Sequence, residues 1–131
     1  MAAIPDQYKD LLQKKAFAHL GTLMKDGSPQ VTPIWFGYDG TNILINSAKG
    51  RLKDKNTRKR PQVALSIADP ENPYRYLGIQ GRVVETTEVG ADAHIDQLAK
   101  KYLGQDKYPY GQPGEVRMIV EIEPKSISGM G

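Results

Sequence analysis

Basic residues gather in one segment of this 131-residue chain, between positions 49 and 60. The segment reads Lys-Gly-Arg-Leu-Lys-Asp-Lys-Asn-Thr-Arg-Lys-Arg, so seven basic residues face a single acid. Its net charge of +6 exceeds the +3 of the whole chain, so the remainder is net negative. The segment follows a strand-like run, and the start of a helix after a strand is a good place to bind phosphate. Gly50 allows close backbone approach there, and Arg51 and Lys53 add charge.

Two other interpretations of the basic segment stay open. A charge run of this kind is often the solvated face of a lysine-rich helix. A nucleic-acid surface would need aromatic residues interleaved with the charges for base stacking, and the segment contains none. We therefore expect no nucleic-acid partner, and a phosphate site remains the more specific hypothesis.

A second candidate for chemistry is the run Thr32-Pro33-Ile34-Trp35-Phe36. A proline inside a strand removes a hydrogen-bond donor, which predicts an edge strand or an opening. Trp35 is consistent either with core packing or with a strand that flanks a flat aromatic ligand, Thr32 reaching the polar edge of that ligand. Tyr74 and Tyr76, on either side of an arginine, predict a pocket rim, a subunit interface or ordinary strand-edge packing.

The chain lacks the usual residues for hydrolysis or metal binding. It has no cysteine and no G-x-S-x-G sequence. Its two histidines, His19 and His94, fall on different predicted elements without metal-ligand spacing, and His94 is expected on the exposed side of a helix. We assign no catalytic side chain and no metal. If the protein is an enzyme, a cofactor is expected to carry the chemistry.

Composition bounds the class of protein. With 39% hydrophobic and 25% charged residues, residues 1–131 predict one globular domain with a small core, which a second subunit would help to stabilise. The N-terminus does not resemble a signal peptide, and no apolar run approaches the ~18 residues of a membrane helix. The absence of cysteine fits a reducing compartment. The expected location is therefore cytoplasmic, without a membrane partner.

Hydrophobic periodicity predicts a mainly β fold. Turn signals and alternation predict six strands, the first three forming an antiparallel meander: 16–24, 29–38, 41–47, 62–68, 74–87 and 115–123. Helical spacing predicts helices over 5–15 and 91–103 and a short helix in the basic segment, with Arg51, Lys55 and Arg58 on one face. Loops are expected at 69–73 and 105–114, and a tail at 124–131. The pattern favours a small antiparallel β-barrel with flanking helices over a parallel dinucleotide-binding fold.

The order and spacing of several short runs resemble one known family. The runs are His19-Leu20-Gly21-Thr22-Leu23, Gln30-Val31-Thr32-Pro33-Ile34-Trp35-Phe36, Asn46-Ser47-Ala48, Arg51-Leu52-Lys53-Asp54-Lys55-Asn56, Pro61-Gln62-Val63-Ala64-Leu65-Ser66, Asp69-Pro70-Glu71-Asn72-Pro73-Tyr74 and Gly81-Arg82-Val83. Together they resemble the pyridoxamine-phosphate-oxidase-like split β-barrel proteins, which use flavin or deazaflavin. The short chain looks most like the branch that uses coenzyme F420, a deazaflavin with a phosphodiester and a polyglutamate tail.

The resemblance implies a homodimer with the cofactor in a groove between the subunits. By that resemblance Arg51 and Lys53 hold the phosphate, and three consecutive residues line the approach to it: Asn46, Ser47 and Ala48. Another three run beside the tricyclic ring: Thr32, Pro33 and Ile34. Tyr74 and Tyr76 come from the neighbouring subunit. From charge alone, we further infer that the acidic tail lies near Lys49, Lys55 and Arg58.

These observations predict an F420-dependent reductase that passes a hydride to an enone-like or quinone-like small molecule. Tyr74 and Tyr110 are candidate proton donors, with solvent as the other source. Two alternatives stay open: an FMN-binding oxidoreductase of the same fold, and a carrier that binds flavin or deazaflavin without turnover. The residues that would bind a pyridoxal ring are not identifiable in this sequence.

Overall fold

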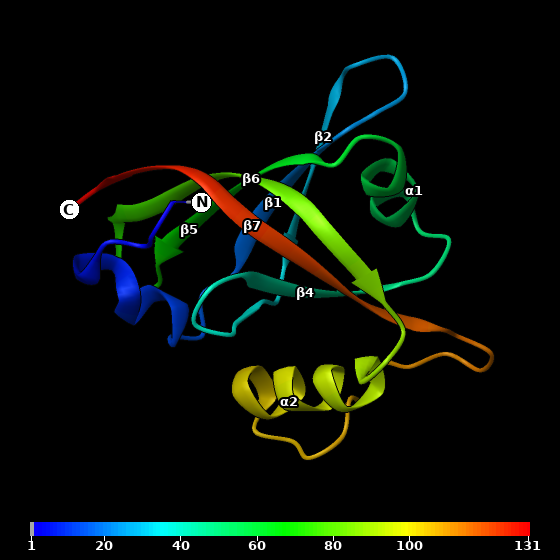
Figure 1. The fold of residues 1–131 in the computed structure, drawn as a ribbon. Helices are drawn as coiled ribbons and strands as arrows, with labels where there is room; N and C mark the ends of the chain where they lie inside the picture. Colours follow the sequence, from blue (N-terminus) through cyan, green and yellow to red (C-terminus); the bar gives the residue numbers. More distant parts are fainter. Residues whose placement is uncertain (1) are drawn as a thin grey trace.

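Seven antiparallel strands form one curved sheet in the computed structural model, which describes residues 2–131 (Figure 1). The spatial order is β2-β1-β5-β6-β7-β4-β3. The strands are β1 (Ala18–Leu23), β2 (Pro29–Ile34), β3 (Gly37–Tyr38), β4 (Ile43–Ala48), β5 (Gln62–Asp69), β6 (Asn72–Thr87) and β7 (Arg117–Met130). The predicted mainly β, antiparallel architecture is confirmed, with seven strands in place of about six.

The core is a cluster of buried hydrophobic side chains from the N-terminal segment and most of the strands. In β5 the side chains of Val63, Leu65 and Ile67 are buried and those between them are more exposed, as the alternation predicted. Leu20 and Ile122, from β1 and β7, are fully buried in the same cluster. Each such side chain contributes about 1.5–3 kcal/mol to folding by leaving water. The buried cluster therefore holds the strands of the sheet together.

The predicted strand over 29–38 is broken in the structure. Trp35 and Phe36 interrupt it, and the two pieces, β2 and β3, form opposite edges of the sheet. The prediction of a simple three-stranded meander is therefore wrong. Phe36 is fully buried, so the chain turns inward there instead of continuing along β1. Pro33 does lie on an edge strand, as predicted. An edge strand tolerates a residue without an N–H because one of its sides has no neighbouring strand.

The long strands β6 and β7 pair along most of their length, from Tyr76 opposite Met130 to Thr87 opposite Ile119. Register shifts occur after Gln80 and after Val83. A Cβ on Gly81, at the first of these irregularities, would lie 2.7 Å from Ile122 Cγ2, so a larger residue would not fit there without a shift. The tail predicted over 124–131 is wrong, because these residues continue β7 and pair with β6. The expected loop at 69–73 is shorter, a tight turn between β5 and β6.

Three helical segments flank the sheet: η1 (Asp6–Leu12), α1 (Leu52–Lys59) and α2 (Ala91–Leu103). Both α-helices agree with the prediction, and α2 ends at Gly104 in the left-handed conformation (φ 71°). The helix predicted over 5–15 is a shorter 3-10 helix that buries Tyr8, Leu11 and Leu12 against the sheet. Neither α-helix of residues 2–131 is long and apolar enough to cross a membrane.

Candidate functional site

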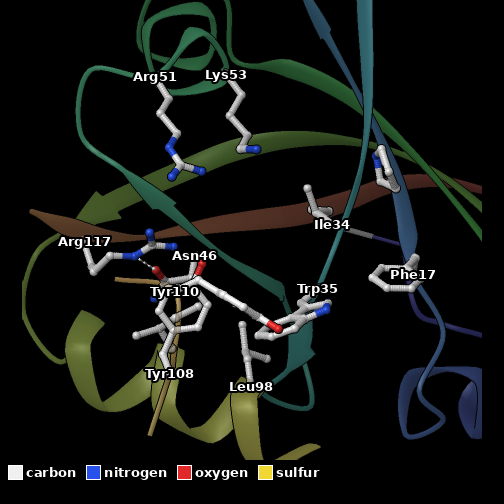
Figure 2. A pocket seen from close by; sticks show the side chains of 12 residues that line it. Phe17, Ile34, Trp35, Asn46, Arg51, Lys53, Leu98, Tyr108, Tyr110 and Arg117 are labelled. Carbon is white, nitrogen blue, oxygen red and sulfur yellow. Dashed lines mark hydrogen bonds between the residues drawn. The ribbon is translucent and has the colours of Figure 1, made fainter. Parts of the chain in front are cut away.

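A pocket of about 210 Å³ opens where the start of α1, the strand β4, the end of β2 and the helix α2 meet (Figure 2). Arg51 and Lys53 enter it from the start of α1, Arg117 lies beside Tyr108 and Tyr110, and Trp35 lies across the pocket from Arg117. Its lining consists of Phe17, Pro33, Ile34, Trp35, Asn46, Arg51, Lys53, Ile95, Leu98, Tyr108, Tyr110 and Arg117.

Three cations converge on the pocket: Arg51, Lys53 and Arg117. Glu115 pairs with the two arginines, at 2.7 Å from Arg117 Nη1 and 3.5 Å from Arg51 Nη2. Burial and the charges of both arginines lower the pKa of Lys53 from its ordinary value. We call Arg51, Lys53, Arg117 and Glu115 the cationic corner of the pocket. Three positive charges and one negative charge give it a net charge of about +2 in partly buried surroundings, which suits a phosphate group.

Local structure fixes the position of Arg51 and Lys53. Gly50 makes a turn at positive φ (89°), and its N–H donates to Asp54 Oδ2 at 2.8 Å. The other oxygen of Asp54 accepts from Arg58 Nε at 2.8 Å. Asp54 thus reaches back from the first turn of α1 to close the preceding loop, as a capping residue does. Arg51 is the N-cap, so its side chain and that of Lys53 leave from the positive end of the helix.

Interactions with the sheet hold α1 in place. The buried Asn56 donates from Nδ2 to Thr22 Oγ1 of β1 at 3.1 Å. Arg60, which follows the helix, donates from Nε to the Leu23 carbonyl at 2.8 Å. These two hydrogen bonds hold the second half of α1 against β1. They therefore also fix the position of the helix start, which carries Arg51 and Lys53.

Asn46 organises the side of the pocket opposite α1. Its Oδ1 accepts from Arg117 Nε at 2.8 Å, which fixes the orientation of the amide because arginine only donates. Its Nδ2 therefore faces the Ala91 carbonyl at 2.9 Å and His94 Nδ1 at 3.1 Å. Asn46 thus links the guanidinium of Arg117 to the first turn of α2.

His94 is buried, with 7% of its surface exposed, so its predicted exposed position is wrong. It packs next to Asn46 and Gly37, on the face of α2 that also carries Leu98. Burial lowers the pKa of His94 to about 4, so the ring is neutral near pH 7. It therefore adds no charge to the site, and it accepts a hydrogen bond from Asn46 at Nδ1.

Aromatic rings form the remaining wall. Trp35 stacks on Tyr102 with ring centroids 5.2 Å apart and an angle of 2° between the planes, and Phe17 stacks on the same tyrosine at 5.8 Å. Tyr108 packs edge-on against Trp35 and against Tyr110. The Tyr102 hydroxyl donates to the Ala16 carbonyl at 2.6 Å, and burial raises its pKa to about 12. Trp35 therefore packs against a neighbouring ring and also lines the pocket, and this wall could support a flat ligand.

Five of the predicted site residues line this pocket: Pro33, Ile34, Asn46, Arg51 and Lys53. Thr32 lies beside them on β2, outside the lining, and its Oγ1 is buried without a partner among the described residues. Ser47 and Ala48 are buried next to Asn46 in β4 and do not line the pocket.

The remaining predicted residues lie elsewhere. Lys55 and Arg58 line a separate hollow with Lys25, Lys59 and Arg60, so they do not share a face with Arg51 as predicted. The shared face is absent because Arg51 precedes the first turn of the helix, and because the side chain of Arg58 forms an ion pair with Asp54. Tyr74 is 78% exposed on β6 and does not line the pocket of its own chain. Its role from a neighbouring subunit stays a prediction.

Sequence reasoning did not assign Phe17, Ile95, Leu98, Tyr108 and Arg117 to the site. Tyr108 lies in the predicted loop over 105–114, whose two tyrosines and two prolines were a signal for a functional loop. Arg117 gave no signal, because it is an isolated charge at the start of an alternating strand. Only its contacts with Asn46 and Glu115 show its place.

Fold and site together define a small antiparallel β-barrel protein with a pocket lined by three cations and by aromatic side chains. The sequence model of the pyridoxamine 5'-phosphate oxidase family matches residues 4–131. The chain therefore belongs to the pyridoxamine 5'-phosphate oxidase family, whose members are oxidoreductases with flavin-type cofactors, and the predicted split β-barrel is confirmed.

Solved structures agree with this assignment. An F420 reductase is 33% identical, with a TM-score of 0.84 over 95% of this chain and 98% of the other. This match supports the predicted resemblance to the deazaflavin branch. Two further structures share the fold at lower identity. A Listeria innocua protein described as a candidate pyridoxamine 5'-phosphate oxidase is 21% identical (TM-score 0.73; 95% and 96% covered). The Mycobacterium tuberculosis conserved hypothetical protein Rv2991 is 18% identical (TM-score 0.74; 98% and 85% covered). None of the curated proteins compared matches the chain.

Proposed function

We propose that this protein is a coenzyme F420-dependent reductase that acts on enone-like or quinone-like small molecules. The observation that carries the proposal is the pocket that brings Arg51, Lys53 and Arg117 together with aromatic side chains. Similarity to an F420 reductase over nearly the whole chain supports the choice of deazaflavin over FMN.

The residues present fit such a cofactor. The net positive charge of the cationic corner complements a phosphodiester, and Arg51 and Arg117 supply planar guanidinium groups that can each donate two hydrogen bonds to it. Pro33, Ile34 and Trp35 offer an apolar and aromatic surface for the ring. The hollow at Lys55 and Arg58 lies at the other end of α1 and suits an acidic tail.

We also propose that the working protein is a homodimer. The pocket of one chain, about 210 Å³, is smaller than the roughly 300–1,000 Å³ of typical small-molecule sites. A second subunit that covers its open side would enlarge and close it, and the exposed Tyr74 is available for such a role. Sedimentation of the purified protein tests this, and a monomer at micromolar concentration would contradict it.

In this proposal the chain supplies binding, orientation and exclusion of water. Bound deazaflavin would supply the hydride when reduced. Arg51, Lys53 and Arg117 would hold the phosphate end, and the aromatic wall would keep water from the ring. Tyr110 lines the pocket and carries a hydroxyl that could donate the proton, whereas Tyr74 does not line it.

Titration of the purified protein with F420 and with FMN, followed by fluorescence, tests the proposal. The double variant Arg51→Ala/Lys53→Ala should bind F420 about 2–4 kcal/mol more weakly, because charge-assisted hydrogen bonds are lost. The matched control is Lys9→Ala/Lys100→Ala, which removes the same charge from exposed positions outside the pocket. Equal affinity in both double variants would contradict the assignment.

The same titration separates the alternatives. Tight FMN binding that does not change when Lys55 and Arg58 are neutralised would favour an FMN oxidoreductase. F420 binding without turnover of any compound in a panel of electrophiles would favour a carrier. Steeply salt-dependent binding to oligonucleotides would favour a nucleic-acid function.

A further inference from the structure

A second pocket, also of about 210 Å³, lies between α2, the end of η1, the edge strand β3 and its neighbour β4. Leu98 lines both this pocket and the candidate cofactor site, so α2 separates the two. The polar groups around it include His94, Gln97 and Lys101, and Leu12 and Leu44 are among its apolar walls. Among residues 2–131, no acidic residue lines it. Nothing in the proposed reduction uses this pocket.

His94 presents an unsatisfied donor here. Its Nδ1 accepts from Asn46, so the neutral ring carries its proton on Nε2. Nε2 is buried and has no hydrogen-bond partner in the described part of the chain. A buried donor that is left unpaired is unfavourable, so a ligand that accepts from it would be stabilised. A Cβ on Gly37 would lie 3.7 Å from Nε2, so the lack of a side chain at position 37 leaves space beside this nitrogen.

Lys101 provides a cation in the lining of the same pocket. Its Nζ donates to the carbonyls of Leu12 at 3.2 Å and Phe36 at 3.1 Å, so one N–H stays available. Nζ also lies 4.4 Å from the centre of the Phe36 ring. No carboxylate of residues 2–131 is within ion-pair distance of it. Burial lowers the pKa of Lys101 to about 8, so the group is still largely charged near pH 7 without a counterion.

We propose that this second pocket binds a small monocarboxylate, which accepts from His94 Nε2–H and pairs with Lys101 Nζ. One cation and one neutral donor match a single negative charge with two acceptor oxygens. A phosphate dianion would exceed the charge available. The leucine walls suit a short apolar substituent on the acid. The site is formed by one chain without the cofactor, so its test does not depend on the proposed reductase activity.

Nuclear magnetic resonance of the imidazole nitrogens tests the proposal, since the chain has only two histidines. Sodium butyrate is the probe, and butyramide at the same ionic strength is its neutral counterpart. We expect butyrate to shift the Nε2–H signal of His94 saturably and to leave the ring of His19 unchanged. Lys101→Gln should weaken binding about tenfold or more, because it removes the paired charge. Lys100→Gln, an exposed neighbour on α2, should not.

Gly37→Ala provides an independent variant, because it keeps both bonds of Lys101 and places a methyl group in the space beside Nε2. We expect it to abolish the butyrate-dependent shift while the protein stays folded by circular dichroism. A shift that grows linearly without saturation would overturn the proposal. So would equal binding of butyramide, or unchanged butyrate affinity in Gly37→Ala.

Discussion

Asp54 is 3% exposed, and each of its two oxygens accepts one hydrogen bond, from Gly50 N–H and from Arg58 Nε. Asp54→Ala removes both acceptors and leaves a backbone donor unpaired. We expect the free energy of unfolding to fall by about 1–3 kcal/mol. Urea denaturation measures this loss. F420 affinity should also decrease, because the loop before Arg51 loses its fixed geometry.

Asp54→Asn is the matched variant, since the amide oxygen can still accept from Gly50 while the charge is lost. It should recover part of the stability lost in Asp54→Ala. If Asp54→Ala were as stable as the unmodified protein, the first turn of α1 would not depend on this carboxylate.

The residues of the site differ in how far the sequence predicts them. Arg51 and Lys53 could be identified because they belong to a local charge cluster next to a strand, and local patterns survive folding. Arg117 and His94 could not, because their roles depend on Asn46, which lies 71 and 48 positions away. A sequence without an alignment carries no signal for such contacts.

At the scale of elements, hydrogen bonds from Arg75 of β6 connect η1 to the sheet. Its guanidinium donates to both oxygens of Asp10, at 2.6 and 3.0 Å, and to Asp69 at 3.0 Å. These hydrogen bonds lower the pKa of Asp10 from 3.8 to about 2. Between these values the unfolded chain binds more protons than the folded one. The contribution of Asp10 is therefore complete above pH 4 and is lost as the pH falls toward 2.

In the variant Asp10→Asn, the free energy of unfolding should consequently decrease less steeply as the pH falls below 4. We expect the difference in unfolding free energy between the unmodified protein and Asp10→Asn to be larger at pH 5 than at pH 2.5. Urea denaturation at the two pH values measures it. A constant difference would show that the pairing of Asp10 with Arg75 does not titrate in this range.

The packing of η1 also depends on Gly129 near the end of β7. A Cβ at this position would lie 2.7 Å from Tyr8 Cζ and 2.9 Å from the Tyr76 carbonyl, closer than such contacts allow. Gly129→Ala should therefore displace Tyr8 and lower the free energy of unfolding by about 1–3 kcal/mol. Gly111→Ala is the control, because a Cβ there would lie 3.9 Å from its nearest neighbour and the backbone needs no positive φ. Equal stability of both variants would contradict this packing.

Helices and strands could be predicted where the sequence periodicity of a segment determines its structure. They could be predicted less well where packing against distant residues determines it. Alternation in β5 and helical spacing in α2 were sufficient to place both elements. The interruption at Trp35 and Phe36 could not be read from the sequence, because it arises when Phe36 turns into the core and the chain leaves β1. The end of β7 was missed for a similar reason. Its polar residues beyond Pro124 pair with β6, and only the pairing makes them a strand.

At the scale of the whole molecule, charge is unevenly distributed. The segment 49–60 carries +6 while the complete chain carries +3. Part of this charge is neutralised locally, because Arg58 pairs with Asp54 and Arg51 pairs weakly with Glu115. Lys55 and Lys59 make no ion pair within residues 2–131. The hollow at the far end of α1 therefore keeps an attraction for anions that extends into solvent.

This distribution predicts the kinetics of cofactor binding under the proposed function. Association of F420 with a polyglutamate tail should slow several-fold when ionic strength rises from about 0.05 to 0.5 M, because the Debye length falls below ~5 Å. Lys55→Gln/Lys59→Gln should reduce this salt dependence, and Lys9→Gln/Lys100→Gln, which removes equal charge elsewhere, should not. Stopped-flow fluorescence measures the rates. If both double variants kept the full salt dependence, the tail would not follow α1, and the cationic corner alone would attract the cofactor.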